Sequence, residues 1–263
     1  MSVQNRSIGY VTGKAVDLLT KFSIPLYVKD RYGRPEQFGT GFFVRARESH
    51  FLVSAAHVLD VARTRRVFYY TTPTTVRALT GKVLTTGFPN NRDDDPLDVG
   101  VMKMTGDGLP PYREVDKFAM DISYLHPNYV PRANKHYVIV GFPATKSIID
   151  TQRRTALVSP YAYRSDSFDD KDYVSMGLNA ATHVALPLNL RKGIDTTGKT
   201  RTFPKPQGMS GSPIVVLYED TNKKQPRVFP VVAIGVRYRG SQKVLIGTDV
   251  RFAVEAIGRF LRT

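Results

Sequence analysis

The sequence predicts an all-β protein of two six-stranded antiparallel barrels, closed by a C-terminal helix. The chain has 263 residues, and its 20 glycines and 17 prolines imply many turns. Between these turns lie short runs rich in β-branched and aromatic residues, which are typical of strands. The runs form two groups of about six, separated by a polar interval with prolines around 106–118. Two such groups suit a pair of small barrels.

The two ends of the chain show helical spacing of apolar residues. Val16, Leu19 and Phe22 predict a short helix over 11–22, and the apolar positions after Asp249 predict a helix over 249–262. The expected strands are IPLYVKD, GTGFFVRA, HFLVSAA, RVFYYTT, TGKVLTT and LDVGVMKM in the first group, and HYVIVGFP, RTALVSP, HVALPLNL, SPIVVLY, FPVVAIGVR and KVLIGTDV in the second.

We therefore expect one unit over residues 1–263 with three parts. An N-terminal barrel occupies about 22–115, a C-terminal barrel about 119–248, and the helix 249–262. The stretch 161–175, YAYRSDSFDDKDYVS, is too polar for a core and is interpreted as an insertion that frames a cleft.

The cysteine count restricts both chemistry and location. The chain has no cysteine, which excludes disulfides, thiolate–zinc sites and a cysteine nucleophile. The N-terminal stretch lacks the apolar run of a signal peptide, and no apolar run is long enough to span a bilayer. We therefore expect a cytoplasmic protein without a membrane partner.

The net charge of +15 attracts acidic partners. The basic residues are dispersed, however, and the runs RTRR and RYRG are short. A solvated basic surface is therefore favoured over dedicated nucleic-acid binding.

The stretch QGMSGSP, with Ser210 between Gly208 and Gly211, is a candidate nucleophile turn. Glycines on both sides allow a tight turn, in which neighbouring backbone N–H groups can point into one space, as an oxyanion hole needs. An ordinary turn is the alternative, because a serine becomes a nucleophile only beside a base.

The best candidate for that base is His57. It follows the buried strand FLVSAA, whose small residues leave room for another segment to pack close to the imidazole. The other four histidines, His50, His126, His136 and His183, lack a comparable setting.

A carboxylate is then needed to orient the imidazole, and DDDPLDVGVMKM offers four. Asp93, Asp94 and Asp95 form a polar run that is most simply a solvated loop. Asp98 opens an apolar strand, where an unpaired buried charge would be costly, so an imidazole partner would explain its position.

The three segments together resemble the trypsin-like (chymotrypsin-fold) serine peptidases, of the bacterial intracellular or viral type. GTGFFV…FLVSAAHVL, LDVGVMKM and GMSGSPIV occur in the order His, Asp, Ser, and VIVGFP is similar to the strand that opens the second barrel in bacterial members. The resemblance implies a serine protease that cleaves protein or peptide substrates.

Carried over by position, the resemblance assigns Ser210 as nucleophile, His57 as general base and then acid, and Asp98 as the orienting group. The N–H groups of Gly208 and Ser210 would bind the oxyanion, and the segment from Gly39 to Gly41 would be scaffold.

Two departures from the family pattern stand beside Ser210. Met209 replaces the aspartate that pairs with a newly cut N-terminus in zymogen-type members, so activation by that ion pair is not expected. Ser212 replaces a more usual glycine, a mild change. A protease in a cytosol needs restraint, so a regulatory protein partner is expected unless its specificity is very narrow.

Specificity is expected to depend on Pro204, Lys205 and the strand AIGVRYRG with Arg237 and Arg239. Basic side chains facing a pocket would favour an acidic substrate residue. Each side chain can equally project into solvent, and a preference for small or apolar residues is the default.

Other classes of function are less well supported. GIDTTGKT at 193–200 matches a phosphate-binding loop, but two prolines follow where that loop needs a helix, so a hairpin turn is the better interpretation. The histidines show no spacing typical of metal ligands. We expect no cofactor and no metal. A catalytically silent barrel that binds acidic partners or nucleic acid, and an esterase using the same triad, stay open as alternatives.

Overall fold

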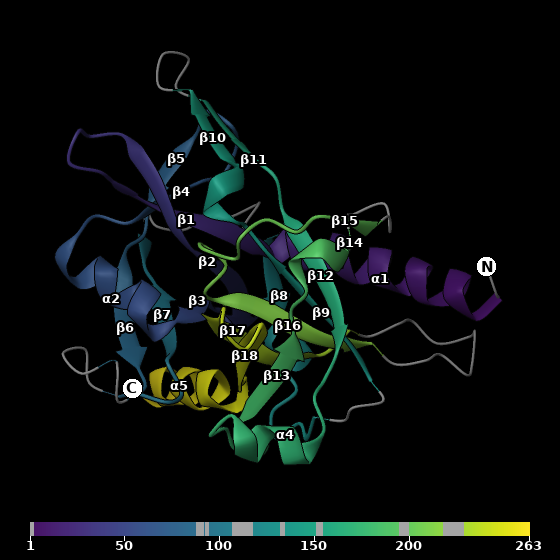
Figure 1. Ribbon diagram of the computed structural model, residues 1–263. Helices are drawn as coiled ribbons and strands as arrows, with labels where there is room; N and C mark the ends of the chain where they lie inside the picture. The colour runs from purple at the N-terminus through teal and green to yellow at the C-terminus, as the bar shows by residue number, and fades with distance from the viewer. Residues whose placement is uncertain are drawn as a thin grey trace.

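The computed structural model shows two curled β-sheets that face each other, with helices at the periphery (Figure 1). It describes residues 3–87, 92, 95–106, 118–131, 135–150, 155–194, 200–217 and 229–263. Most of the interval expected as a linker, 107–117, lies outside this range. Among the described residues, no helix is both long enough and apolar enough to cross a membrane.

The first sheet follows the N-terminal helix α1 and carries helix α2. The elements are α1 (Val3–Phe22), β1 (Ser23–Lys29), β2 (Pro35–Ala46), β3 (Ser49–Ala55), α2 (Ala56–Thr64), β4 (Phe68–Tyr70), β5 (Val76–Ala78), β6 (Gly81–Thr85), β7 (Val99–Met104) and β8 (Ala119–Asp121). The strand order is β5-β4-β1-β2-β3-β7-β6, and β8 pairs with β2 in parallel. The other pairs are antiparallel.

The second sheet contains the strands on either side of Ser210. Its elements, with the helices and the separate hairpin β10–β11, are β9 (His136–Gly141), β10 (Ser147–Asp150), β11 (Thr155–Val158), β12 (Tyr161–Asp166), α4 (Asp170–Ser175), β13 (His183–Pro187), β14 (Gly193–Ile194), β15 (Thr200–Arg201), β16 (Ser212–Leu217), β17 (Val231–Arg239), β18 (Val244–Asp249) and α5 (Arg251–Arg262). The strand order is β13-β18-β17-β16-β9-β12-β14-β15. Short 3-10 turns occur at Ile122–Tyr124, Ala144–Lys146 and Leu190–Lys192.

The two terminal helices pack on the sheets through one apolar stripe each. In α1 the stripe begins at Val11 and ends at Phe22, and the helix is longer than the predicted 11–22. In α5 it contains Ala253, Ile257 and Phe260. The ring of Phe260 lies 6.0 Å from that of Phe51 in β3, so the C-terminal helix returns to the first sheet.

The predicted chymotrypsin-like double barrel is therefore confirmed. Within the described residues each sheet has eight strands once its short strands are counted, against the six predicted. The pairing of β14 with β15 agrees with the hairpin interpretation of 193–200, although 195–199 lie outside the described residues.

The interpretation of 161–175 as a polar insertion is wrong. Its first part is β12, which pairs with β9 along its whole length, and Tyr163 and Tyr173 are buried. The hydroxyl of Tyr173 accepts a hydrogen bond from the backbone N–H of Ala185. Because the polar end of the side chain has a partner inside the protein, Tyr173 can belong to the core.

Candidate active site

His57 lies where the buried strand β3 runs into α2. Ala55 and Ala56 just before it are fully buried, and their small side chains let β7 approach closely enough for Ala55 to pair with Val99. The imidazole itself is 43% exposed. A buried strand thus presents the ring at the surface of the first sheet.

Asp98 contacts the inner edge of that ring. Its carboxylate accepts one hydrogen bond from His57 Nδ1 at 2.6 Å and a second from the His57 backbone N–H at 2.9 Å. Because an ionised carboxylate can only accept, Nδ1 carries the hydrogen and the lone pair of the neutral ring is on Nε2. The Asp98 side chain is 5% exposed, and its φ of 52° is in the left-handed region, where asparagine and aspartate are the most tolerated side chains.

Asp95 is not part of a solvated loop, contrary to the sequence interpretation. It is buried, and its carboxylate contacts the Arg92 guanidinium at 2.7 Å and the Thr86 hydroxyl at 2.9 Å. Arg92 also pairs with Asp60 at 2.5 Å. Asp95 is thus committed to a structural ion-pair network, whereas Asp93 and Asp94 lie outside the described residues.

The second sheet supports the segment that carries Asp98. The Thr248 hydroxyl donates to the carbonyl of Leu97 at 2.6 Å, and His183 Nε2 lies 3.0 Å from the carbonyl oxygen of Pro96. This role of His183 could not be predicted from the sequence, because the Pro96 carbonyl that it contacts belongs to a distant segment.

The loop around Ser210 requires its two glycines. Gly208 has a φ of +87° and Gly211 a φ of +94°. A Cβ on Gly211 would lie 2.0 Å from the Thr40 carbonyl oxygen and 2.1 Å from Ser54 Oγ. The expected tight turn is therefore present, and side chains at these two positions are excluded by both backbone conformation and space.

Only some of the backbone N–H groups of the loop have a hydrogen-bond acceptor among the described residues. Met209 N–H donates inward to the Pro206 carbonyl at 3.0 Å. Among the described residues, no backbone or side-chain oxygen accepts from the N–H of Gly208 or of Ser210. The two amides that the resemblance assigns to the oxyanion hole are thus available to a ligand.

Thr40 of β2 connects this loop to the first sheet. Its hydroxyl donates to the Gly208 carbonyl at 2.8 Å, and its N–H donates to the Ser210 carbonyl at 2.9 Å. The same hydroxyl accepts from the N–H of Phe142 at 3.2 Å. Ser54 in turn donates to the Thr40 carbonyl at 2.6 Å. Both Thr40 and Ser54 are fully buried, and neither was singled out from the sequence.

Ser210 is therefore attached to the strand pair that leads into His57. Its hydroxyl is half-buried and lies 3.4 Å from the Val236 carbonyl. No hydrogen bond joins it to the His57 ring within the described residues. The structure thus brings His57 and Asp98 into direct contact and places the Ser210 loop on the neighbouring strands.

The two departures from the family pattern are both buried. Met209 is 2% exposed and belongs to an apolar cluster of the second sheet that includes Tyr137 and Phe203. Ser212 is fully buried, and its hydroxyl has no hydrogen-bond partner among the described residues. A Cβ on Gly141 would lie 1.9 Å from that hydroxyl, so the space for Ser212 is provided by a glycine opposite.

The residues expected to set specificity lie at the surface. Pro204 is half-buried, and Lys205 and Arg237 are exposed without a described carboxylate partner. Arg239 donates to the Met176 carbonyl at 2.7 Å, which directs it toward the segment after α4. The described residues contain no group of three or more histidines and carboxylates that could hold a metal ion.

Comparison with known proteins places the fold. No family model and no curated protein matches the sequence. The VesB protease of Vibrio cholerae shares the fold at a TM-score of 0.54 and 16% identity; the match covers 90% of this chain and 63% of VesB, so this chain spans less than two thirds of that protein. A Glu endopeptidase is similar at a TM-score of 0.48 and 13% identity, with 88% of each chain covered. The two curled half-barrels described above are thus the fold of the chymotrypsin-type serine proteases.

Proposed function

We propose that the chain is a serine endopeptidase in which Ser210 is the nucleophile, His57 the base, and Asp98 the orienting carboxylate. The observation that carries this proposal is the contact of Asp98 with Nδ1 of a partly exposed histidine. It leaves the lone pair of the neutral ring on Nε2, while no described residue accepts a hydrogen bond from the N–H groups of Gly208 and Ser210 in the adjacent loop.

In the proposed reaction, Ser210 Oγ attacks the peptide carbonyl as its proton moves to His57 Nε2. The carbonyl oxygen becomes an oxyanion and is bound by the N–H groups of Gly208 and Ser210. Collapse of this intermediate breaks the C–N bond, and His57 returns the proton to the leaving amine. Water then attacks the acyl-enzyme by the same steps, releasing the acid product and restoring the serine. In this step the Ser210 hydroxyl exchanges the Val236 carbonyl for His57 Nε2 as its hydrogen-bond partner.

A fluorophosphonate probe tests the nucleophile. We expect it to label the folded protein at Ser210, and the label to be absent from Ser210→Ala. Ser212→Ala is a matched control, because Ser212 is two residues away and fully buried. Labelling that persists in Ser210→Ala, or is absent from the folded wild type, would refute the assignment; the second result would favour a silent barrel.

Peptide-library profiling tests the reaction and its specificity. We expect cleavage of peptide bonds that is lost in Ser210→Ala, with losses on the order of 10³–10⁶-fold. Exposed Lys205 and Arg237, without carboxylate partners among the described residues, support a preference for an acidic residue beside the cleaved bond. Cleavage of esters without cleavage of any peptide would favour the esterase alternative instead.

A further inference from the structure

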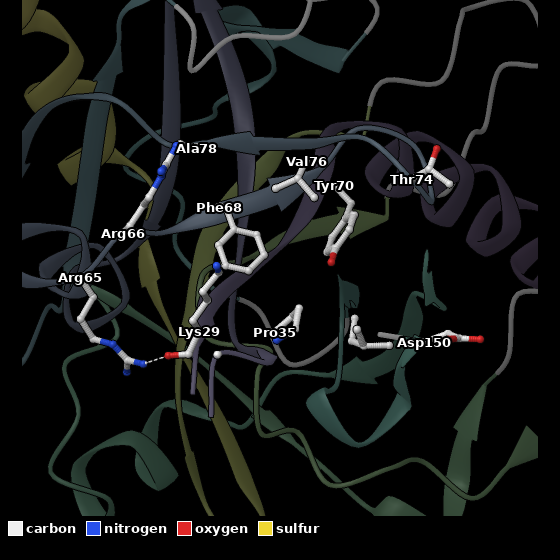
Figure 2. Close-up of a pocket in the computed structure, with 12 residues that line it drawn as sticks. Lys29, Pro35, Arg65, Arg66, Phe68, Tyr70, Thr74, Val76, Ala78 and Asp150 are labelled. Carbon is white, nitrogen blue, oxygen red and sulfur yellow. Dashed lines mark hydrogen bonds between the residues drawn. The ribbon is translucent and has the colours of Figure 1, made fainter. Parts of the chain in front are cut away.

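A hollow of about 810 Å³ lies on the first sheet, and none of the candidate catalytic residues lines it. Its walls come from the strands β4 and β5, the end of β1, the start of β2, the residues just after α2, and the hairpin strand β10. Figure 2 shows Phe68, Tyr70 and Val76 on one side of this hollow and Pro35 and Asp150 on the other. Segments far apart in the sequence therefore build it together.

The hairpin β10–β11 is held against the first sheet at two points. The Tyr27 hydroxyl and Ser147 Oγ are 2.8 Å apart, and the backbone N–H of Ala156 donates to the Pro73 carbonyl at 2.8 Å. The hairpin pairs with no other strand within the described residues. These contacts give the hollow a wall that is fixed to the sheet.

A second hollow of about 570 Å³ continues the first toward the Ser210 loop. The two share Pro35 and Ile149 among their lining residues, so they are contiguous. The second also reaches Ala144, whose N–H donates to the Gln207 carbonyl at 2.8 Å, one residue before Gly208. We call the two hollows together the side groove. It extends from Phe68 and Val76 at its far end to Ala144 near the Ser210 loop.

The far end of the side groove is apolar, with three basic side chains on its rim and one carboxylate, Asp150, on the opposite wall. Val76 on the edge strand β5 is 50% exposed and therefore offers accessible apolar surface beside the hollow. Lys29, Arg65 and Arg66 also line this end and are exposed. None of the three pairs with a described carboxylate, and Arg65 instead donates to the Lys29 carbonyl (Figure 2).

These features favour a peptide over a nucleic acid. Single-stranded nucleic acids bind by stacking bases on exposed aromatic faces. Here Phe68 is 7% exposed and packs on Tyr27 with ring centroids 5.8 Å apart. Tyr70 lies edge-on to Tyr27 at 5.2 Å. The other accessible apolar groups, Val76 and Ile149, are aliphatic and suit a peptide side chain.

We propose that the side groove binds an acidic segment of the protein substrate, with an apolar side chain beside Val76 and carboxylates beside Arg65 and Arg66. This inference rests on the proposed protease function. The segment would lie outside the residues around the cleaved bond and would add affinity through an independent contact. The charge of +15 favours its approach.

Binding is tested first with the Ser210→Ala variant, which removes any cleavage. The probe is a fluorescent random copolymer of glutamate and tyrosine, compared with polyglutamate by anisotropy. We expect the copolymer to bind more tightly, and Arg66→Glu and Val76→Asp each to weaken it roughly tenfold. The matched controls are Arg259→Glu and Val174→Asp, which make the same changes at exposed positions of α5 and α4.

Three binding results would overturn the proposal. The first is equal weakening by the control variants, which would show a general charge effect. The second is equal affinity for polyglutamate, which would deny the apolar contact. The third is a single-stranded oligonucleotide that binds more tightly than the copolymer and responds to the same two variants.

The link to the substrate is tested with the wild-type enzyme. A cleavable peptide is compared with the same peptide extended by glutamates and a tyrosine, and we expect roughly tenfold higher kcat/KM for the extended form. Arg66→Glu should remove this gain and Arg259→Glu should keep it. No gain, or a gain that survives Arg66→Glu, would overturn the side groove even where the fluorophosphonate labels Ser210. Absence of that label would refute the proposed protease instead, whatever the copolymer does.

Discussion

The carboxylate of Asp98 accepts two hydrogen bonds from His57, one from the ring at Nδ1 and one from the backbone N–H. The backbone N–H of His57 holds the carboxylate in place without help from the ring. The carboxylate, positioned in this way, then orients the imidazole through Nδ1. We expect Asp98→Asn to lower kcat by on the order of 10³–10⁴-fold, because an amide can donate to Nδ1 and favour the wrong tautomer. Steady-state kinetics measure this.

The control for that variant is Asp95→Asn, three residues earlier. Asp95 pairs with Arg92, so its loss should lower the temperature of unfolding while the folded protein keeps its kcat. If Asp98→Asn turned over at the wild-type rate, the orienting role would pass to another carboxylate.

Thr40 is expected to act as a positioning residue for the oxyanion site. Thr40→Val keeps the shape of the side chain but leaves the Gly208 carbonyl and the Phe142 N–H without a partner. We expect kcat to fall about 10- to 100-fold with little change in KM. Thr40→Ser should retain most of the rate. A rise in KM at constant kcat would place Thr40 in substrate binding instead.

Gly211→Ala should destabilise the folded protein and lower its activity, although the substitution adds only one methyl group. The added Cβ meets two buried oxygen atoms, of Thr40 and Ser54, at a φ of +94°. We expect a loss of roughly 3 kcal/mol or more in the free energy of unfolding. Gly13→Ala in α1 is the matched control, since nothing lies within 4 Å of its Cβ. That variant should be neutral or more stable by up to about 1 kcal/mol.

Met209→Asp tests whether this site differs from zymogen-type members. The carboxylate would be buried in an apolar cluster, and we expect a cost of roughly 3 kcal/mol or more with loss of activity. Met209→Leu should cost less than about 1.5 kcal/mol and stay active. Thermal unfolding and fluorophosphonate labelling check both. If Met209→Asp were stable and active, a cationic group would have to pair with the buried carboxylate.

Alkaline pH should destabilise the protein through Tyr27. Burial raises the pKa of this phenol from 10.0 to about 12. The unfolded chain therefore ionises first, so the contribution is complete below pH 10 and is lost as the pH rises toward 12. Tyr27→Phe should be about 1 kcal/mol less stable at neutral pH, because it lacks the hydrogen bond to Ser147. Between pH 10 and 12 its free energy of unfolding should fall by on the order of 2 kcal/mol less than that of the wild type. Tyr32→Phe, at a 64% exposed position, should leave the profile unchanged.

The sequence predicted the fold and the His57–Asp98 pair because both depend on local patterns. A buried strand that ends in small residues marks His57, and a lone carboxylate in an apolar strand marks Asp98. Thr40, Ser54 and His183 were not predictable, since their partners are backbone atoms that only the fold brings near. Asp95 and the stretch 161–175 were misinterpreted for a related reason: polarity indicated exposure, while Arg92 and the hydroxyl of Tyr173 have partners inside.

The carbonyl groups of Pro96 and Leu97 accept hydrogen bonds from His183 and Thr248, which belong to the other half of the molecule. A fragment that ends after β7 would keep both His57 and Asp98 but would lack His183 and Thr248, whose hydrogen bonds hold the segment before Asp98 in place. Complementation would follow: two inert pieces, expressed apart and then mixed, would regain turnover only on reassociation. The alignment of His57 with Asp98 thus depends on residues from both halves of the chain.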